Sequence, residues 1–494
     1  MFTPLGNTEI GRGPYLCRAE HYKWENSILF TCAEWVINGH NTVVLTRLAR
    51  TVAYSIYTRA ITELSHIKLE ITNPWALPKN RSKSLAAAVL ITLILLLTFP
   101  AGCSDKKMNH DNQKIATEST SADPMAIHQR AIAIDMHVDT VQRLLDEDVD
   151  LQQQLSDGHF DAVRAKAGSL DAQFFSIWVE PQLFGGGGAR AMKRADDQIA
   201  AVRALAEQHP ETWLLATSAA DIRRAASEGK IAALLGLEGG YAIDERLENV
   251  QRYYDLGVRY MSPAWSVSTS WAGSSGDDVG ATRGLNEFGK NVVREMNRLG
   301  MMIDVSHVSD PTFWDIVNAS TAPVIATHSA CRAIADVPRN LTDDMIRALA
   351  KTGGVVNVIF YPEHLEPGWS QKKKQIDAEI ATMVQEASVA ERGDAVHKKM
   401  ARDRVRQREY ARRLPPVKVS RIVDHIDHIV KLVGVDHVGI GSDFDGVQIT
   451  TADLATVAEL PNLTKELLRR GYTESDVDKI LGGNMLRVME AIAR

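Results

Sequence analysis

The stretch AIAIDMHVDT, residues 131–140, is an apolar run that ends in a histidine and an aspartate two positions apart. On a β-strand, side chains two residues apart point to the same face, so His137 and Asp139 would converge on one point. An imidazole and a carboxylate aimed together suit a divalent metal of the zinc type. The alternative is a hydrogen-bonded core histidine, followed by an aspartate that caps the next helix. The remaining strand ends decide between the two interpretations.

Apolar runs of similar length recur along the chain and alternate with helical patterns such as RAMKRADDQIAAVRALAEQ. The runs are rich in Val and Ile, as expected for parallel strands that are buried on both faces. Eight such strands with intervening helices predict an α/β fold, a (β/α)8 TIM barrel. The candidate strands are residues 131–138, 171–179, 231–238, 258–265, 301–307, 323–329, 354–361 and 437–444.

Ionisable side chains stand at the ends of five of these runs. The active sites of (β/α)8 barrels lie at the carboxyl ends of the strands, so these groups would meet at one rim. Burying several charges together is tolerable when they share a cation. The set exceeds the four ligands of one tetrahedral zinc ion, and two metals that share a carboxylate would use it more economically. The six residues are His137, Asp139, Glu238, His307, His328 and Asp443.

Seven motifs together resemble a known family. DMHVDT, GLEGG, DVSHVS, ATHS, VPRNLTDD, GSDFDG and GGNMLRVMEA run in this order from about residue 131 to residue 494. They closely resemble the membrane dipeptidase, or renal dipeptidase, family of zinc metallopeptidases. The resemblance implies a (β/α)8 barrel of the metal-dependent hydrolase type with two zinc ions. It also implies hydrolysis of the peptide bond of dipeptides by a metal-bridged hydroxide.

The resemblance implies a metal ligand set as well. His137, Asp139 and Glu238 would hold one zinc ion. Glu238, His307 and His328 would hold the other, with Glu238 as the bridge between the two ions.

Residues that contact the substrate are implied in the same way. Asp443 would bind the substrate amino group and carry the proton to the leaving amine, and Arg339 would bind the dipeptide carboxylate. Trp265 ends the run YMSPAW, where the family has a histidine that contacts the substrate and the developing oxyanion. An indole cannot carry a proton at neutral pH, so oxyanion support and side-chain preference are expected to differ here. The other aromatic candidates for the pocket are Tyr361, Trp178 and Trp271.

Two other functions stay open from the sequence. One is a broader amidohydrolase that acts on N-acyl amino acids, lactams or deaminase-type substrates. Such barrels often begin with His-x-His and use a lysine on strand four, whereas this chain has His-x-Asp and no such lysine. The other is a non-catalytic surface lipoprotein that keeps the metals for stability. Asp443 and Arg339 argue against it, because neither is needed to hold a metal.

A charged stretch at about residues 366–412 separates the last two strands. Its composition predicts an exposed helical insertion without a catalytic role. The net charge of −6 and the 45% of hydrophobic residues are those of an ordinary globular protein. Dipeptides are the expected partners and no nucleic acid is expected, since there is no basic stripe; a homodimer is left open. Of four cysteines only Cys331 lies in the barrel domain, so we expect no disulfide framework.

The segment KNRSKSLAAAVLITLILLLTFPAGCSDKK, residues 79–107, has the pattern of a secretion signal. Basic residues precede an apolar run, and small residues precede Cys103. PAGC resembles the lipobox of bacterial lipoproteins, although Pro100 stands where that motif usually has Leu. We therefore expect residues 79–103 to be a signal peptide and Cys103 to be lipidated. The protein would be exported and lipid-anchored to a bacterial membrane, facing the periplasm or the cell surface; an uncleaved signal anchor is the alternative.

The domain boundaries follow from these assignments. A secretion signal belongs at the start of a chain, so we expect residues 1–78 to be a gene-start error, with a genuine cytoplasmic tail as the alternative. Residues 104–125 are polar and predict a flexible tether. Residues 126–494 would form the dipeptidase domain.

Overall fold

The computed structural model describes residues 123–493. The predictions for residues 1–78, for the signal peptide with Cys103 and for nearly all of the tether lie outside the described residues. Within the described part of the chain, no helix combines the length and the apolar character needed to cross a membrane.

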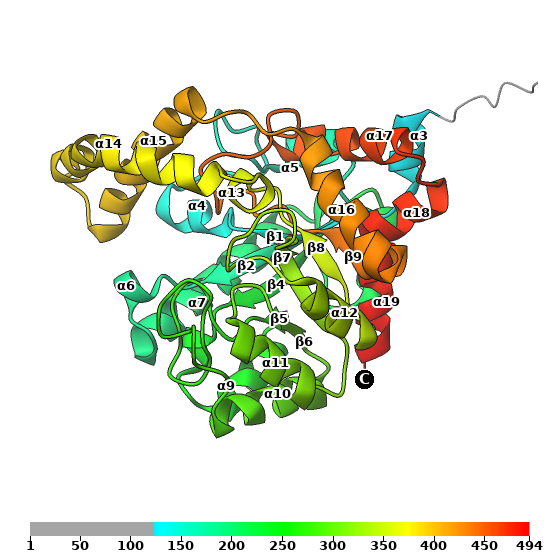
Figure 1. Ribbon diagram of the computed structural model, residues 1–494, viewed down its shortest axis with the longest axis horizontal. Helices are drawn as coiled ribbons and strands as arrows, with labels where there is room; N and C mark the ends of the chain where they lie inside the picture. The colour runs from blue at the N-terminus through cyan, green and yellow to red at the C-terminus, as the bar shows by residue number, and fades with distance from the viewer. Residues whose placement is uncertain (1–122, 494) are drawn as a thin grey trace, which may run out of the picture. The chain divides into compact units, whose positions relative to one another are not determined.

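Parallel strands form the wall of a barrel (Figure 1). Eight strands neighbour one another in the order β1-β2-β4-β5-β6-β7-β8-β9, and the short β3 pairs with β4. A parallel bridge between Val138 and Phe444 joins the segment after β9 to the end of β1. The strands are β1 Ile134–Val138, β2 Ala172–Trp178, β3 Trp213–Leu215, β4 Ile231–Glu238, β5 Val258–Met261, β6 Met302–Asp304, β7 Val324–Ser329, β8 Val356–Val358 and β9 Val438–Ile440.

Each of the eight predicted runs contains one strand of the barrel, so the predicted (β/α)8 fold is confirmed. Several strands are shorter than predicted. The run at 258–265 leaves the sheet after Met261, shortly before Pro263, which has no N–H to donate to a neighbouring strand. Trp265 therefore lies in the loop after β5. β3 was not predicted, because three residues are too short to display a period.

Amphipathic helices cover the barrel between successive strands (Figure 1). In α10, Val292 and Met296 face the core, Asn286 caps the first turn through the Gly289 N–H, and Gly300 ends the helix at a φ of 77°. The helices up to β8 are α3 Pro124–Arg130, α4 Val141–Asp146, α5 Ala162–Ala167, α6 Pro181–Phe184, α7 Gly188–Gln208, α8 Ala219–Ser227, α9 Leu247–Asp255, α10 Glu287–Leu299, α11 Asp310–Ala319 and α12 Asp343–Lys351. Those after β8 are α13 Pro362–Leu365, α14 Trp369–Ala390, α15 Ala395–Arg413, α16 Val419–Val433, α17 Pro461–Arg469, α18 Glu474–Asp478 and α19 Asn484–Ile492.

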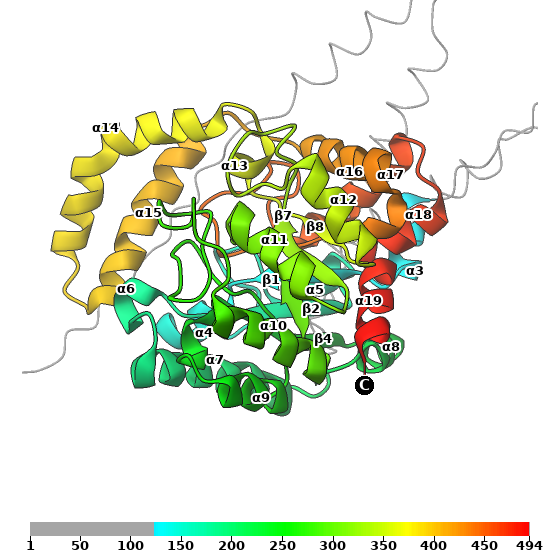
Figure 2. The ribbon, with the colours of Figure 1, turned by 60° about the horizontal axis from the view of Figure 1, so that its bottom comes forward.

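The predicted insertion consists of α14 and α15, which lie side by side as a long antiparallel pair (Figure 2). The prediction of an exposed pair is wrong for one face of each helix. Ile376, Ile380 and Val384, spaced four residues apart, form a buried stripe on α14. One face of α15 lines the cavity described below. So thin an apolar stripe is hard to recognise within a stretch that is otherwise charged.

The barrel interior holds a small apolar cluster beneath the rim. Leu234 belongs to it, together with Phe174 of β2, Tyr260 of β5 and Met485 of α19. Leu234 and Glu238 are four residues apart on β4, so both point to the same side of the sheet. The strand therefore directs the Glu238 carboxylate inward at the carboxyl end of the barrel.

Gly236 makes room for Tyr260 in this interior. The two residues are paired in the register of β4 and β5, and a Cβ on Gly236 would overlap the Tyr260 ring. Tyr260 is fully buried, so its ring cannot move into solvent. Only glycine fits here without a shift of the neighbouring strand.

We expect Gly236→Ala to lower the free energy of unfolding by about 1–3 kcal/mol, the usual cost of overfilling a packed core. Scanning calorimetry of the two proteins would measure the effect as a lower transition temperature. Gly186→Ala is the matched control, because nothing lies within 4 Å of the Cβ that it would add. Equal transition temperatures for Gly236→Ala and the wild type would contradict the packing argument.

Candidate metal centre

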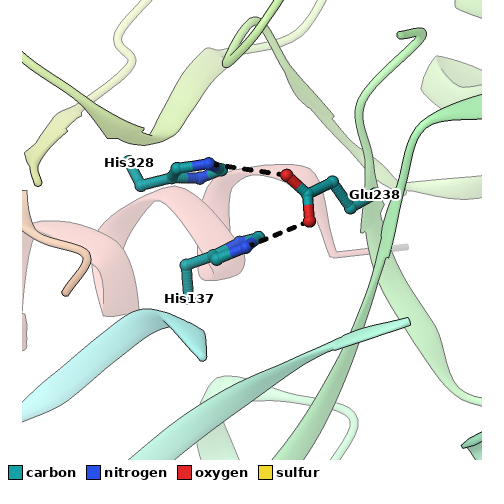
Figure 3. A group of neighbouring side chains, drawn as sticks. All are labelled: His137, Glu238 and His328. Carbon is teal, nitrogen blue, oxygen red and sulfur yellow. Dashed lines mark ion pairs between the residues drawn. The ribbon is translucent and has the colours of Figure 1, made fainter. Parts of the chain in front are cut away.

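The five predicted metal ligands come together at the carboxyl end of the barrel, around Glu238. Figure 3 shows the Glu238 carboxylate facing His137 and His328. Oε2 of Glu238 lies 3.3 Å from His137 Nε2. Oε1 lies 2.9 Å from His307 Nε2 and 3.5 Å from His328 Nε2. Asp139 Oδ2 lies 3.7 Å from His137 Nε2. The two oxygens of one carboxylate thus face two different sets of donor atoms.

The donor atoms of this group fit a bound cation. His307 Nε2 and His328 Nε2 are only 2.9 Å apart. Two atoms, His137 Nε2 and Asp139 Oδ1, are buried and have no hydrogen-bond partner in the described chain. Buried polar atoms without a partner are costly, and imidazole with carboxylate donors is the ligand set that zinc-type ions prefer. The residues therefore match the metal chemistry expected from the sequence.

Asp443 joins the same group from the loop after β9. A carboxylate oxygen of Asp443 and ligand atoms of His137 and Asp139 lie within 4.8 Å of one another. The Asp443 N–H donates to the carbonyl oxygen of His137 at 3.1 Å. Burial raises the pKa of the Asp443 carboxyl well above its usual range, and the Asp139 carboxylate adds to this effect. A raised pKa makes this carboxyl group a better candidate for proton transfer than an exposed aspartate.

Hydrogen bonds select the nitrogen that each histidine turns toward Glu238. The Tyr260 hydroxyl lies 2.9 Å from His137 Nδ1, and Thr327 Oγ1 lies 2.9 Å from His328 Nδ1. Each contact leaves Nε2 free for the centre, as is usual for metal-binding histidines. We did not predict Tyr260 or Thr327 from the sequence. The sequence feature that could have pointed to both residues is a polar side chain inside an otherwise apolar strand.

The charges of the centre are set by burial and by the Glu238 carboxylate. Burial lowers the pKa of His307 to about 4 and that of His328 well below its usual value, and the nearby Arg339 acts in the same direction. For His137, burial acts to lower the pKa, but the Glu238 carboxylate helps to raise it well above the usual value. A metal ion bound at this centre would compete with protons for the histidine nitrogens.

Two residues of the centre have a strained backbone. His307 and Asp443 have φ angles of 71° and 62°, in the left-handed region that favours glycine. Such a conformation costs about 1–3 kcal/mol for each residue and tends to occur at functional sites. The His307 carbonyl oxygen is held in place by the Ser275 N–H at 2.8 Å. The strained backbone that orients these two side chains therefore lowers the stability of the fold.

Arg339 lies beside the centre rather than on the wall of the cavity. Its Nη2 donates to the carbonyl oxygen of His328 at 2.8 Å. Nε and Nη1 are buried and have no hydrogen-bond partner within residues 123–493. Buried donors without a partner cost free energy, so an acceptor bound by this guanidinium group would be stabilising.

A cavity of about 590 Å³ opens over the centre. Asp139, Glu238, His307 and Asp443 belong to its lining. Aromatic rings form part of its wall, and one face of α15 covers it through residues such as Lys399. Candidate metal ligands and side chains that can contact a bound molecule therefore line the same cavity.

The aromatic candidates divide between this wall and the core. The Trp265 ring lies 4.8 Å from that of Trp178 and 6.1 Å from that of His307, and both tryptophans line the cavity. Tyr361 also lines it, and its hydroxyl donates to Glu363 at 2.8 Å. Trp271 is instead a buried core residue, with only 1% of its surface exposed.

Comparisons with known proteins agree with this geometry. Residues 122–494 match the model of the membrane dipeptidase family, peptidase family M19. Dipeptidase 3 of Rattus norvegicus is 33% identical over 339 residues, which are 67% of this chain but 57% of that relative. The chain thus spans little more than half the length of this relative.

Two crystal structures of similar proteins extend the comparison. The probable dipeptidase PvdM from Pseudomonas aeruginosa has a TM-score of 0.62 and 27% identity, covering 75% of this chain and 97% of that one. A metallopeptidase from Rhodobacter sphaeroides, liganded with a phosphinate mimic of the dipeptide L-Ala-D-Ala, has a TM-score of 0.59 and 25% identity, covering 73% and 99%. With a family match that extends over the whole barrel and the ligand geometry at its rim, this chain belongs to the membrane dipeptidase family.

Proposed function

We propose that this protein is a zinc-dependent dipeptidase that hydrolyses the peptide bond of dipeptides. The observation that carries the proposal is the position of Glu238, whose two carboxylate oxygens face separate sets of histidine nitrogens. Membership of the membrane dipeptidase family supports the reaction, and the dipeptide mimic bound by the Rhodobacter relative supports the class of substrate.

Two zinc ions would share Glu238. His137 and Asp139 would complete the ligands of one ion, and His307 and His328 those of the other. Ions held there would polarise the scissile carbonyl and lower the pKa of a water molecule, which is the chemistry that peptide hydrolysis requires. The contacts of His137 Nδ1 with the Tyr260 hydroxyl and of His328 Nδ1 with Thr327 Oγ1 support this assignment, because an Nδ1–H that donates to the hydroxyl oxygen leaves Nε2 free.

Asp443 and Arg339 would handle the two ends of the substrate. Asp443 would bind the amino group and pass a proton to the leaving amine nitrogen, and its raised pKa suits that exchange. Arg339 would bind the free carboxylate, since Nε and Nη1 are buried donors without an acceptor. Neither residue is required to hold the zinc ions, so together they favour a dipeptidase over a broader amidohydrolase.

Elemental analysis of the purified protein should give about two zinc ions per chain, as in other two-metal hydrolases. Glu238→Gln should lower both, because one neutral amide cannot replace a carboxylate shared by two ions. Glu248→Gln, at an exposed position, serves as the control and should keep the full content. A single tightly bound zinc ion, with no loss in the Glu238 variant, would contradict the shared carboxylate.

A dipeptide should be a better substrate than its C-terminal amide. Charged hydrogen bonds from Arg339 to the carboxylate should contribute about 1.5–3 kcal/mol, which is roughly a tenfold to hundredfold preference in kcat/KM. Arg339→Met should remove most of this preference while the zinc content stays unchanged. Arg347→Met on α12 is the control, because Arg347 lies on the helix surface, where its one ion pair among residues 123–493 is with Asp344. Equal activity of the wild type toward dipeptide and amide would exclude the proposed role of Arg339.

We also propose that the protein is exported and anchored by a lipid on Cys103, on the basis of the signal-like sequence at 79–103. Cells that express the wild type should incorporate radiolabelled palmitate into the mature protein, and Cys103→Ser should abolish both the label and the cleavage of the precursor. Cys331→Ser, at a buried position in the barrel, is the control and should keep the label. An unlabelled wild type would refute the lipid anchor.

A further inference from the structure

One part of the cavity wall has no role in the proposed reaction. Glu180, just after β2, lines the cavity but is only 7% exposed. Its Oε1 accepts the Gln182 N–H at 3.3 Å, and in the described chain it forms no ion pair with a basic side chain. Burial raises the pKa of the Glu180 carboxyl, with Lys399 acting in the opposite direction. The carboxylate is therefore partly removed from water, and no cation of the described chain forms an ion pair with it.

The surface next to Glu180 is suited to a cation. The Trp178 and Trp265 rings meet edge to face at 4.8 Å, and Trp178 Nε1 is buried without a hydrogen-bond partner. Lys399 of α15 places its own Nζ 5.7 Å from the centre of the Trp178 ring, where an ammonium group is attracted by the ring face. The same Nζ donates to Asp403 at 2.7 Å. Lys399 is thus paired with Asp403, and no ion pair between Lys399 and Glu180 occurs in the described chain.

The order of the strands indicates which end of a dipeptide would meet this wall. Glu180 follows β2, whereas Arg339 follows β7. In the closed order of the barrel, three strands separate β2 from β7 in either direction. The two side chains therefore stand on opposite sides of the centre. A dipeptide with its carboxylate at Arg339 would extend its N-terminal residue toward Trp178 and Glu180.

We propose that Glu180, with the indole wall of Trp178 and Trp265, forms a subsite for a cationic side chain on the N-terminal residue of the dipeptide. The proposal rests on the proposed function and names its substrate class: dipeptides that begin with lysine or arginine. The ammonium or guanidinium group would pair with the open oxygen of Glu180 and lie against an indole face.

The test compares lysyl-glycine with norleucyl-glycine, which has a side chain of similar length without the charge. The zinc-loaded wild type should favour lysyl-glycine by about tenfold in kcat/KM, the ratio expected for one charged hydrogen bond. Glu180→Gln should bring the ratio close to one. Glu147→Gln is the matched control, because Glu147 lines the same cavity but is already paired with Arg143 at 3.2 Å. Glycyl-lysine and glycyl-norleucine should not differ in any of the three proteins.

Calorimetry with non-hydrolysable analogues, in which a methylene group replaces the scissile carbonyl, separates the subsite from the reaction. The lysyl analogue should bind about tenfold more tightly than the norleucyl analogue, and Glu180→Gln should remove the difference. If no dipeptide is hydrolysed but this binding difference is found, the proposed activity fails and the subsite stands. Equal binding of the two analogues, a preference that survives in Glu180→Gln, or a preference for the cation on the C-terminal residue would overturn the subsite.

Discussion

The burial of the Glu238 carboxylate among three imidazoles is the interaction on which the rest of the structure depends. A buried charge costs several kcal/mol unless partners surround it closely. Here the partners are nitrogen atoms of His137, His307 and His328, helped by the Ser176 hydroxyl, which donates to Oε2 at 2.8 Å. Each of these side chains comes from a different part of the barrel wall, so the carboxylate is tolerated only when the wall is complete.

The closure of the barrel and the assembly of the centre use the same contacts. The segment after β9 reaches β1 through the Asp443 N–H, which donates to the His137 carbonyl oxygen, and through the Asp139 N–H, which donates to the Phe444 carbonyl oxygen at 2.9 Å. These bonds complete the ring of strands and also bring Asp443 to the ligands. Fold and site therefore form together, and the left-handed backbone at Asp443 is part of the cost.

The sequence was informative where a single strand carries its own signal. A polar residue at the end of a long apolar run marks both the strand and the rim, which is why the eight strands and the cluster from His137 to Asp443 could be predicted. Contacts between distant segments leave no such local signal. The partner of His137 is Tyr260, which looks like an ordinary core residue until the register of β4 and β5 places it opposite Gly236.

The cavity wall was the least predictable part for the same reason. Glu180 stands after a strand like the metal ligands do, yet its neighbours come from a loop after β5 and from the insertion. The charged sequence of α15 indicates exposure, and only the packing of α14 against it reveals the face that covers the cavity. The periodicity of a sequence predicts which side chains are buried against the nearest core. It does not predict which side chains line a cavity.

The candidate metal centre and the wall of the cavity are built from different elements of this fold. The candidate metal ligands lie on or directly beside the strands, where main-chain hydrogen bonds hold them in place. The wall around Trp265 and Lys399 is built from a loop and an inserted helix. Trp178 connects the two parts, because it is the register partner of Glu238 at the end of β2. A change of loop or insertion can therefore alter the shape of the cavity without moving the Glu238 carboxylate. A change in the register between β2 and β4 would disturb both at once.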